Sequence, residues 1–244
     1  MRRRGSEEQA SKVGRRALNY ECRQPITLAS AETLANLLRY LLFRKGPLTS
    51  NVAEVGGFVR LDGRAEPPDL QFHCGPSFYV RHGFGNPDGH GLTIAPTLVE
   101  PRSRGTLRLR SSDPTDPPLI DPRYLDDRAD LEILRAGVGL GRRIAAAAAL
   151  EAYRGREVTP GAAATGEAEL DAWIRASVES LYHPVGTCKM GNDPLAVVDA
   201  DLKVHGVDNL RVADASIMPT ITNANTNAPT IMIGEQAARR LLAG

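Results

Sequence analysis

The sequence predicts an α+β fold in which an antiparallel β-sheet is flanked by helices and followed by a short strand and a terminal helix. Short β-prone runs broken by Gly and Pro clusters occupy residues 52–110. Apolar residues at helical spacing occupy residues 126–150 and 167–181. With 244 residues, of which 42% are hydrophobic, the chain can bury a substantial core.

The N-terminal half begins with a segment that should have little regular structure. Residues 1–19 are charged and aperiodic, so we expect them to be disordered. Leucines at spacings of three and four then predict an amphipathic helix over 31–43, capped by Ser30 and ended by Gly46 and Pro47. The strands of the sheet are expected at 55–61, 70–73, 92–98 and 106–109, before an extended Asp- and Pro-rich connection at 111–124.

The C-terminal half alternates helices with short strands. The pattern predicts a long helix over 126–150 and a second helix over 167–181, with Trp173 on the apolar face of the second. Pro184 should end that second helix just after His183. Strands are expected at 197–204 and 210–212, and the chain closes with a helix over 229–242 that has Pro229 at an early position.

Bulk composition excludes several function classes. The formal net charge is +1, which gives no overall field to attract nucleic acid or a membrane surface. The cysteines Cys22, Cys74 and Cys188 are odd in number and far apart, which argues against a disulfide framework and favours a reducing compartment, with the cytoplasm as the expected location. No apolar region follows the charged start, so we expect no secretion signal, and the apolar run at 144–150 is too short to span a bilayer.

Three glycines at 137, 139 and 141 resemble the opening of a dinucleotide-binding turn. That turn needs a preceding strand and the spacing G-x-G-x-x-G, with a helix N-terminus meeting the pyrophosphate. Here the glycines lie inside a helical pattern and follow G-x-G-x-G. We therefore interpret them as positions of close helix packing and not as a phosphate site.

Three segments near the C-terminus combine residues that could carry chemistry. In YHPVGTCKMG at 182–191, His183 lies directly before a proline, so the backbone is restricted and the imidazole can be held at a chosen angle. A lone histidine, however, is more often structural. In LRVADASIMP at 210–219, Asp214 follows the predicted buried strand, where it could meet a cofactor or simply cap a turn. In TNANTNAPT at 222–230, the amides could cap the last helix or let its N-terminus stabilise an anion such as a reduced flavin.

Together these segments resemble the glucose-methanol-choline (GMC) family of oxidoreductases that depend on flavin adenine dinucleotide (FAD). The motifs with the family's order and spacing are HPVGTCKMG at 183–191, VD at 198–199, VHGV at 204–207, LRVADASIMP at 210–219, NTN at 225–227 and IMIGE at 231–235. Upstream, GPLTSN at 46–51, EVGGF at 54–58 and RSRGTLRL at 102–109 are similar to the family's substrate domain. The resemblance covers about Tyr20 to Gly244.

The resemblance implies a role for each candidate residue. His183 would accept the proton of an alcohol while hydride passes to the flavin, and Asn225 would hold the alcohol oxygen by a hydrogen bond. Asp214 and Ala215 would contact the ribityl chain or pyrophosphate of FAD. Asn225, Thr226 and Asn227 would bring the last helix to the isoalloxazine ring. The implied domains are a disordered leader at 1–19, a substrate-binding domain at 20–195 and the C-terminal segment of an FAD-binding domain at 196–244.

The sequence departs from the family in one respect. It contains no strand, G-x-G-x-x-G turn and helix to bind the ADP part of FAD. We therefore expect a truncated product of a longer gene or a separately encoded half that needs an N-terminal partner chain. Alone, the chain should be colourless and inactive.

The substrate and two rival functions complete the expectations. A small or medium primary alcohol is favoured over choline, because aromatics make up only 5% of the chain and Trp173 is expected in the core. One rival is a metal-dependent hydrolase, although His73, Cys74, His82 and His90 match no compact ligand motif. The other is a non-catalytic module that keeps the fold without FAD.

Overall fold

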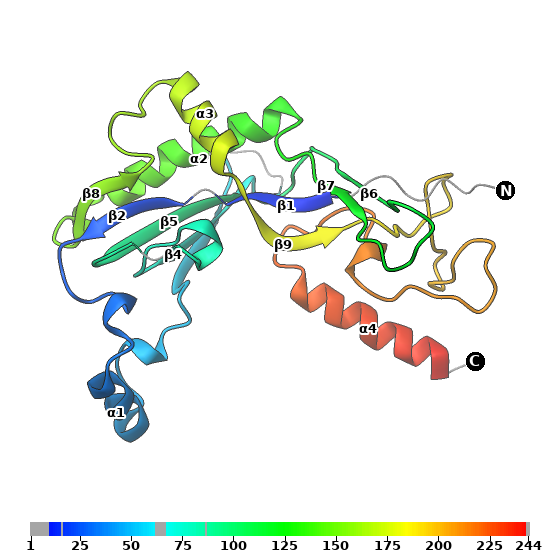
Figure 1. Ribbon diagram of the computed structural model, residues 1–244, viewed down its shortest axis with the longest axis horizontal. Helices are drawn as coiled ribbons and strands as arrows, with labels where there is room; N and C mark the ends of the chain where they lie inside the picture. Colours follow the sequence, from blue (N-terminus) through cyan, green and yellow to red (C-terminus); the bar gives the residue numbers. More distant parts are fainter. Residues whose placement is uncertain (1–9, 16, 62–66, 86, 243–244) are drawn as a thin grey trace. The chain divides into compact units, whose positions relative to one another are not determined.

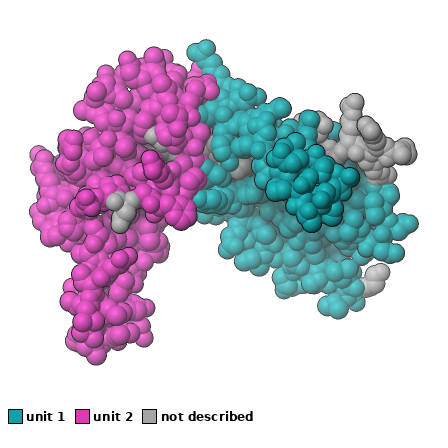
Figure 2. All heavy atoms as spheres, viewed as in Figure 1, with its two compact units in different colours: residues 1–13, 99–130, 180–244 teal, residues 14–98, 131–179 magenta. Residues whose placement is uncertain are grey.

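The computed structural model describes residues 10–15, 17–61, 67–85 and 87–242 (Figure 1). The chain forms two compact units (Figure 2). Unit 1 consists of residues 1–13, 99–130 and 180–244, and unit 2 of residues 14–98 and 131–179. Unit 1 therefore takes in residues 99–130 and 180–195, which the sequence grouped with the sheet.

Unit 2 contains a five-stranded sheet with the order β3-β4-β5-β2-β8. Its strands are β2 (Leu18–Cys22), β3 (Val55–Val59), β4 (Leu70–Gly75), β5 (Gly91–Leu98) and β8 (Arg154–Thr159). Every neighbouring pair is antiparallel, as the sequence predicts. Strands β3, β4 and β5 were expected, whereas β2 and β8 were not. The alternation of side chains places Leu18, Phe72 and Ile94 in the core of this unit.

Helix α2 (Arg128–Ala145) packs closely on this sheet because two of its glycines leave room for core side chains. A Cβ atom at Gly137 would lie 2.9 Å from the Cβ of Pro96, and one at Gly141 would lie 2.4 Å from Cδ1 of Leu18. At Gly139 a Cβ atom would meet nothing within 4 Å. The interpretation of this glycine run as a packing surface is confirmed, and it follows no strand–turn arrangement that could bind a phosphate.

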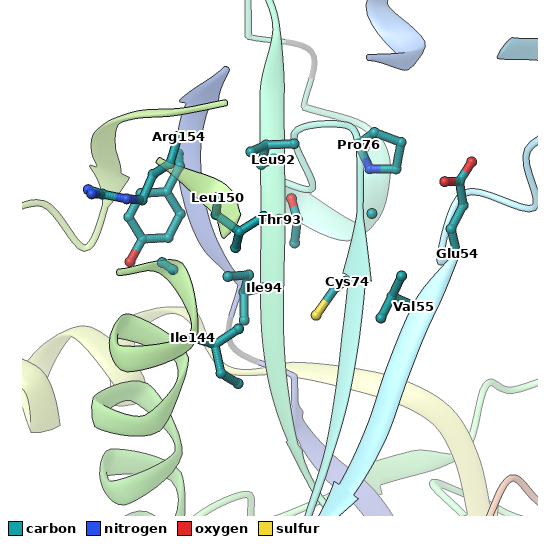
Figure 3. A pocket seen from close by; sticks show the side chains of 13 residues that line it. Glu54, Val55, Cys74, Pro76, Leu92, Thr93, Ile94, Ile144, Leu150 and Arg154 are labelled. Carbon is teal, nitrogen blue, oxygen red and sulfur yellow. The ribbon is translucent and has the colours of Figure 1, made fainter. Parts of the chain in front are cut away.

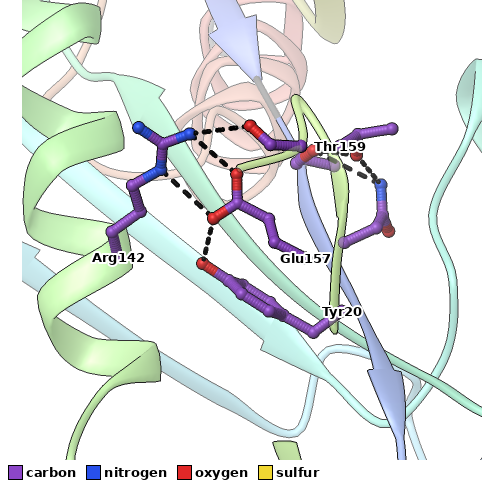
Figure 4. A network of polar contacts seen from close by, with 7 residues as sticks. Tyr20, Arg142, Glu157 and Thr159 are labelled. Carbon is purple, nitrogen blue, oxygen red and sulfur yellow. Dashed lines mark hydrogen bonds and ion pairs between the residues drawn. The ribbon is translucent and has the colours of Figure 1, made fainter. Parts of the chain in front are cut away.

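A polar network around the buried side chain of Tyr20 also joins α2 to the sheet (Figure 4). The hydroxyl of Tyr20 donates to Oε2 of Glu157 at 3.0 Å, and Arg142 donates to both oxygens of that carboxylate at 3.1 and 2.8 Å. Burial raises the pKa of the Tyr20 hydroxyl well above its ordinary value, and the adjacent Glu157 charge adds to the effect. The network thus links β2, α2 and β8 through one carboxylate.

Unit 1 is built around a terminal helix and two small two-stranded sheets. Strand β6 (Thr106–Arg108) pairs with β7 (Leu119–Asp121), and β1 (Ala10–Arg15) pairs with β9 (Glu179–Val185). A 3-10 turn, η5 (Ala215–Ile217), and helix α4 (Asn227–Leu242) follow. The core residues of this unit are Val185, Val198, Leu202, Ile217, Met218, Ile221, Ile233 and Ala237.

Two sequence expectations are corrected by long-range strand pairing. Part of the predicted disordered segment is strand, since Ala10–Arg15 pairs with β9 and Leu18–Cys22 belongs to the sheet, while residues 1–9 and 16 lie outside the described residues. Helix α3 (Glu167–Ser177) ends four residues before the predicted 181, because Val178 is extended with ψ 136°. His183 and Pro184 therefore lie in β9 and not at a helix end.

The remaining differences concern element boundaries and two expected strands. Residues 197–204 and 210–212 form only isolated bridges, and Leu210 is exposed, so the predicted buried strand before Asp214 is wrong. Helix α1 (Leu34–Phe43) is capped by Thr33, whose hydroxyl accepts from the Asn36 N–H, while Ser30 lies in a preceding 3-10 turn. Strand β7 falls in the predicted extended connection, and α2 ends at Ala145 before a short 3-10 turn at 148–150.

Two further observations concern the cysteines and the helices. Cys22, Cys74 and Cys188 are all free thiols. None of the helices in the described part of the chain has the length and hydropathy needed to cross a bilayer.

Candidate active site

Strand β9 fixes the position of His183. The strand pairs with β1, and two residues after the histidine Val185 enters the core of unit 1 with 1% of its surface exposed. Tyr182 and Gly186 have positive φ angles of 59° and 91°, so the backbone turns sharply on both sides of the His-Pro pair. The His183 side chain is half-buried, and its Nδ1 atom is buried. A histidine anchored in this way can be held at a set angle.

The loop after His183 is bound to the turn that carries Asp214. The Cys188 N–H donates to the Ser216 carbonyl at 3.0 Å, and the Met190 N–H donates to the Ile217 carbonyl at 2.8 Å. These two bonds join the segment 182–191, which carries His183, to the segment 210–219, which carries Asp214, although the bonded residues are almost thirty positions apart in the sequence. Further along the loop, Nε2 of His205 lies 3.0 Å from the Gly191 carbonyl oxygen.

Asp214 caps the 3-10 turn η5 through its carboxylate. Its Oδ1 accepts from the Ser216 N–H at 2.7 Å, and the residue is exposed. Ala215, the first residue of η5, is half-buried. Asp214 therefore has a clear structural role as a cap, which was one of the two readings of the sequence, and the carboxylate is also open to solvent.

The amide-rich segment leads directly into α4. Thr226 is buried, and its carbonyl accepts from both the N–H and the hydroxyl of Thr230 at 3.0 and 2.6 Å. Asn225 and Asn227 on either side of it are exposed. The N-terminus of this 16-residue helix thus presents amides to solvent while Thr226 holds the segment in place.

One hydrophobic core brings the three motifs together within unit 1. It contains Val185 from β9, Ile217 and Met218 from the segment after Asp214, and Ile233 and Ala237 from α4. The segments that carry His183, Asp214 and Asn225 are therefore packed around the same set of side chains. Local sequence patterns could not reveal this arrangement. The loop after His183 is held by the backbone carbonyls of Ser216 and Ile217, and backbone bonds of this kind cannot be predicted from side-chain types.

A pocket of about 250 Å³ lies in unit 2, on the sheet near the end of α2 (Figure 3). Its lining is mostly apolar and includes Leu92, Ile94, Ile144 and Leu150. None of the candidate residues of the three motifs lines it. This pocket is therefore separate from the proposed chemistry.

The residues of the metal-hydrolase reading are engaged elsewhere. Nδ1 of His90 lies 2.7 Å from the Thr27 hydroxyl, and Nδ1 of His73 lies 3.3 Å from the Thr97 hydroxyl. The backbone N–H of His82 donates to Glu179 at 3.1 Å, and its Nδ1 lies 3.9 Å from the same carboxylate. Burial raises the pKa of the Cys74 thiol, which disfavours the thiolate that a metal needs. Over the described ranges, no three His, Cys, Asp or Glu side chains gather into a group that could hold a metal ion.

Comparison with known proteins places the chain in a family. The sequence model described as GMC oxidoreductase matches residues 101–234. The chain is 49% identical over 205 residues to an alcohol dehydrogenase [acceptor] of Pseudomonas putida, and 44% identical over 223 residues to a mitochondrial choline dehydrogenase of Mus musculus. These matches cover 84% and 89% of the chain but only 37% of each relative's length.

Solved structures show the same fold. Pyridoxine 4-oxidase from Mesorbium loti superposes with a TM-score of 0.84 and 29% identity, covering 100% of this chain and 45% of the oxidase. A formate oxidase superposes with a TM-score of 0.86 at 23% identity, covering 99% of this chain and 48% of that protein, which supports the fold alone. The matched family region contains both His183 and Asn225, and the chain belongs to the GMC oxidoreductase family.

Proposed function

We propose that this chain is the C-terminal part of an FAD-dependent oxidoreductase that converts a primary alcohol into an aldehyde. The observation that carries the proposal is the shared core of unit 1, which gathers the segments of His183, Asp214 and Asn225. Membership of the family supports flavin-dependent chemistry. The proposal also rests on the length of the relatives, since the chain spans less than half of those it matches.

The residues of unit 1 fit one end of FAD and not the other. The exposed amides of Asn225 and Asn227 at the N-terminus of α4 suit the electron-rich ring system, because a helix N-terminus favours negative charge. Asp214 and Ala215 would contact the sugar-alcohol or phosphate portion. The sequence has no glycine-rich turn for the ADP portion, and in this proposal further polypeptide supplies it.

The chemistry assigned to this chain is proton removal and orientation of the alcohol. Bound FAD supplies the acceptor for hydride. The neutral imidazole of His183 accepts the hydroxyl proton, which raises the electron density on the carbinol oxygen and weakens the adjacent C–H bond. The Asn225 side chain donates a hydrogen bond to that oxygen and restricts its orientation. Both residues would act on the same atom, which is the reason that their segments must share one support.

The exposed face of α4 supports the need for a partner polypeptide. Only Ile233 and Ala237 of this helix are buried, whereas Ile231 and Met232 near its start are more than half exposed. An apolar helix face beside exposed amides is suited to cover by the segment that completes the FAD site. That segment would be either an N-terminal continuation of this polypeptide or a separate chain.

A chimeric protein tests the proposal. Residues 20–244 would replace the corresponding C-terminal region of the 49% identical Pseudomonas putida relative, and flavin absorbance and alcohol-dependent reduction of a dye would be measured. We expect bound flavin and activity with unbranched primary alcohols, with lower kcat/KM for choline. The 244-residue chain alone should retain no flavin on a desalting column.

Two histidine variants of the chimera separate catalysis from folding. His183→Asn should lower kcat by about 10²- to 10⁴-fold while flavin content is unchanged, because the proton acceptor is lost. His205→Asn is the matched control, since His205 belongs to the same unit and its Nε2 lies 3.0 Å from the Gly191 carbonyl oxygen, away from the proposed catalytic residues. Its kcat should stay close to that of the unsubstituted chimera. A flavin-loaded His183→Asn protein with nearly full kcat would refute the assignment, and a flavin-free, inactive chimera would favour a non-catalytic module.

A further inference from the structure

Helix α1 of unit 2 exposes an almost continuous set of large apolar side chains. None of its ten residues is buried. Leu34 and Leu42 are each 71% exposed, and Phe43 is 67% exposed. The set is completed by Leu37, Leu38 and Leu41, each between 44% and 56% exposed. Most soluble proteins avoid a contiguous apolar surface of this kind unless it binds something.

The helix is well defined although it has no core of its own. Its N-terminus is capped by Thr33, and Nδ2 of Asn36 donates to the Ser30 carbonyl at 2.7 Å. Its C-terminus ends at Arg44 in the left-handed conformation, and the turn at Gly46 lies against the side chain of Arg39. Figure 1 shows α1 standing apart from the sheet strands of the same unit. A ten-residue helix held only at its ends is marginal in water and gains stability from a surface that covers its leucines.

The charges on α1 and its C-terminal flank have one sign. Arg39, Arg44 and Lys45 are cationic, and no acidic residue occurs between Thr33 and Lys45. The guanidinium of Arg44 lies 5.0 Å from the ring centre of Tyr40, which keeps that charge beside the helix. The nearest acidic residue in sequence is Glu32, before the cap. Leucines with Arg and Lys on a short helix are the composition of an element that lies in a lipid interface.

We propose that α1 is a docking element for an anionic lipid surface. Its leucines and Phe43 would enter the boundary between headgroups and acyl chains, and Arg39, Arg44 and Lys45 would contact the headgroups. The proposal is independent of the oxidoreductase function. The net charge of +1 does not exclude such a surface, because that value averages this cationic segment with acidic residues elsewhere.

Vesicle co-sedimentation of the whole chain tests the proposal. The vesicles would be phosphatidylcholine alone, and phosphatidylcholine with phosphatidylglycerol in a three-to-one ratio. We expect binding to the anionic vesicles that weakens with added salt, and much weaker binding to the neutral ones. The double variant Arg44→Gln/Lys45→Gln should lower the partition coefficient by about fivefold for each cation removed.

Each α1 variant is compared with a control variant in which residues of the same type are replaced elsewhere in the chain. Arg143→Gln/Lys203→Gln removes two exposed cations from other elements and leaves the net charge equal to that of the first double variant. Leu41→Ser/Leu42→Ser should lower binding by about tenfold or more through loss of apolar area. Phe84→Ser is its control, since Phe84 is 90% exposed in another part of unit 2. Circular dichroism of each variant would verify that the chain is folded.

Three results would overturn the proposal. The first is equal binding of the unsubstituted chain to neutral and anionic vesicles, which would indicate nonspecific adsorption. The second is a loss of binding that is as large in the control variants as in the α1 variants. The third is the absence of vesicle binding together with a light-scattering mass that falls on Leu41→Ser/Leu42→Ser, which would make α1 a surface for self-association.

Discussion

Two glycines on the same helix should respond in opposite directions to one added methyl group. In α2, alanine in place of glycine favours the helix by about 1 kcal/mol at either position. At Gly139 the new Cβ meets nothing within 4 Å, so Gly139→Ala should stabilise unit 2 by nearly that amount. At Gly141 it would lie 2.4 Å from Cδ1 of Leu18, whose side chain is fully buried and cannot move into solvent. Overpacking of this kind costs about 1–3 kcal/mol.

The free energies of unfolding of the two variants should therefore differ by about 2 kcal/mol. The fluorescence of Trp173, the only tryptophan of the chain, reports on unit 2 because the residue lies in α3. With a urea dependence of about 2 kcal/mol per molar, the midpoint of Gly141→Ala should lie about 1 M below that of Gly139→Ala. A Gly141→Ala midpoint equal to or above the Gly139→Ala midpoint would show that α2 does not pack on the sheet through this glycine.

Two further predictions concern buried polar groups. Because burial raises the pKa of Tyr20 in the folded state, the unfolded chain releases this proton first, and the associated stability is present below about pH 10 and is lost as pH rises above it. The free energy of unfolding by urea, measured between pH 8 and pH 11, should therefore fall more steeply with pH for the unsubstituted chain than for Tyr20→Phe. Equal slopes for the two proteins would contradict a raised pKa of Tyr20 in the folded state. Asp130 accepts from the backbone N–H groups of Arg102 and Ser103 at 2.8 and 2.9 Å with 1% of its surface exposed, so Asp130→Ala should destabilise the protein by about 3 kcal/mol. Thermal unfolding followed by circular dichroism would measure the loss, Asp130→Asn should recover part of it, and an unchanged melting temperature for Asp130→Ala would show that these bonds contribute little.

Local patterns predicted the elements whose stability is local. Helices α2 and α4 and strands β4 and β5 have the spacing of apolar residues that their environments require, and β3 was predicted from its β-prone residues although it is largely exposed. Strands β2 and β8 were missed because charged residues interrupt their apolar pattern, and both are defined by pairing with distant partners such as Glu157 opposite Tyr20. The same holds for β9, which exists because residues near the start of the chain pair with it.

The residues of the candidate site could be predicted from the sequence, but the contacts that hold them in position could not. Motifs around His183, Asp214 and Asn225 could be recognised from residue types and order. The strand expected before Asp214 was wrong because Leu210 is exposed and the segment has only one-residue bridges. The carbonyls of Ser216 and Ile217 that hold the loop after His183 are backbone groups, which leave no trace in a pattern of side chains.

The chain passes back and forth between its two units, so neither unit is a continuous stretch of polypeptide. Deleting residues from either terminus would remove strands or helices whose partners lie hundreds of atoms away along the backbone. Truncated variants are therefore poorly suited to determining which unit carries which function. Single substitutions, or permuted chains that keep every segment, are the manipulations from which a clear genetic interpretation can be obtained.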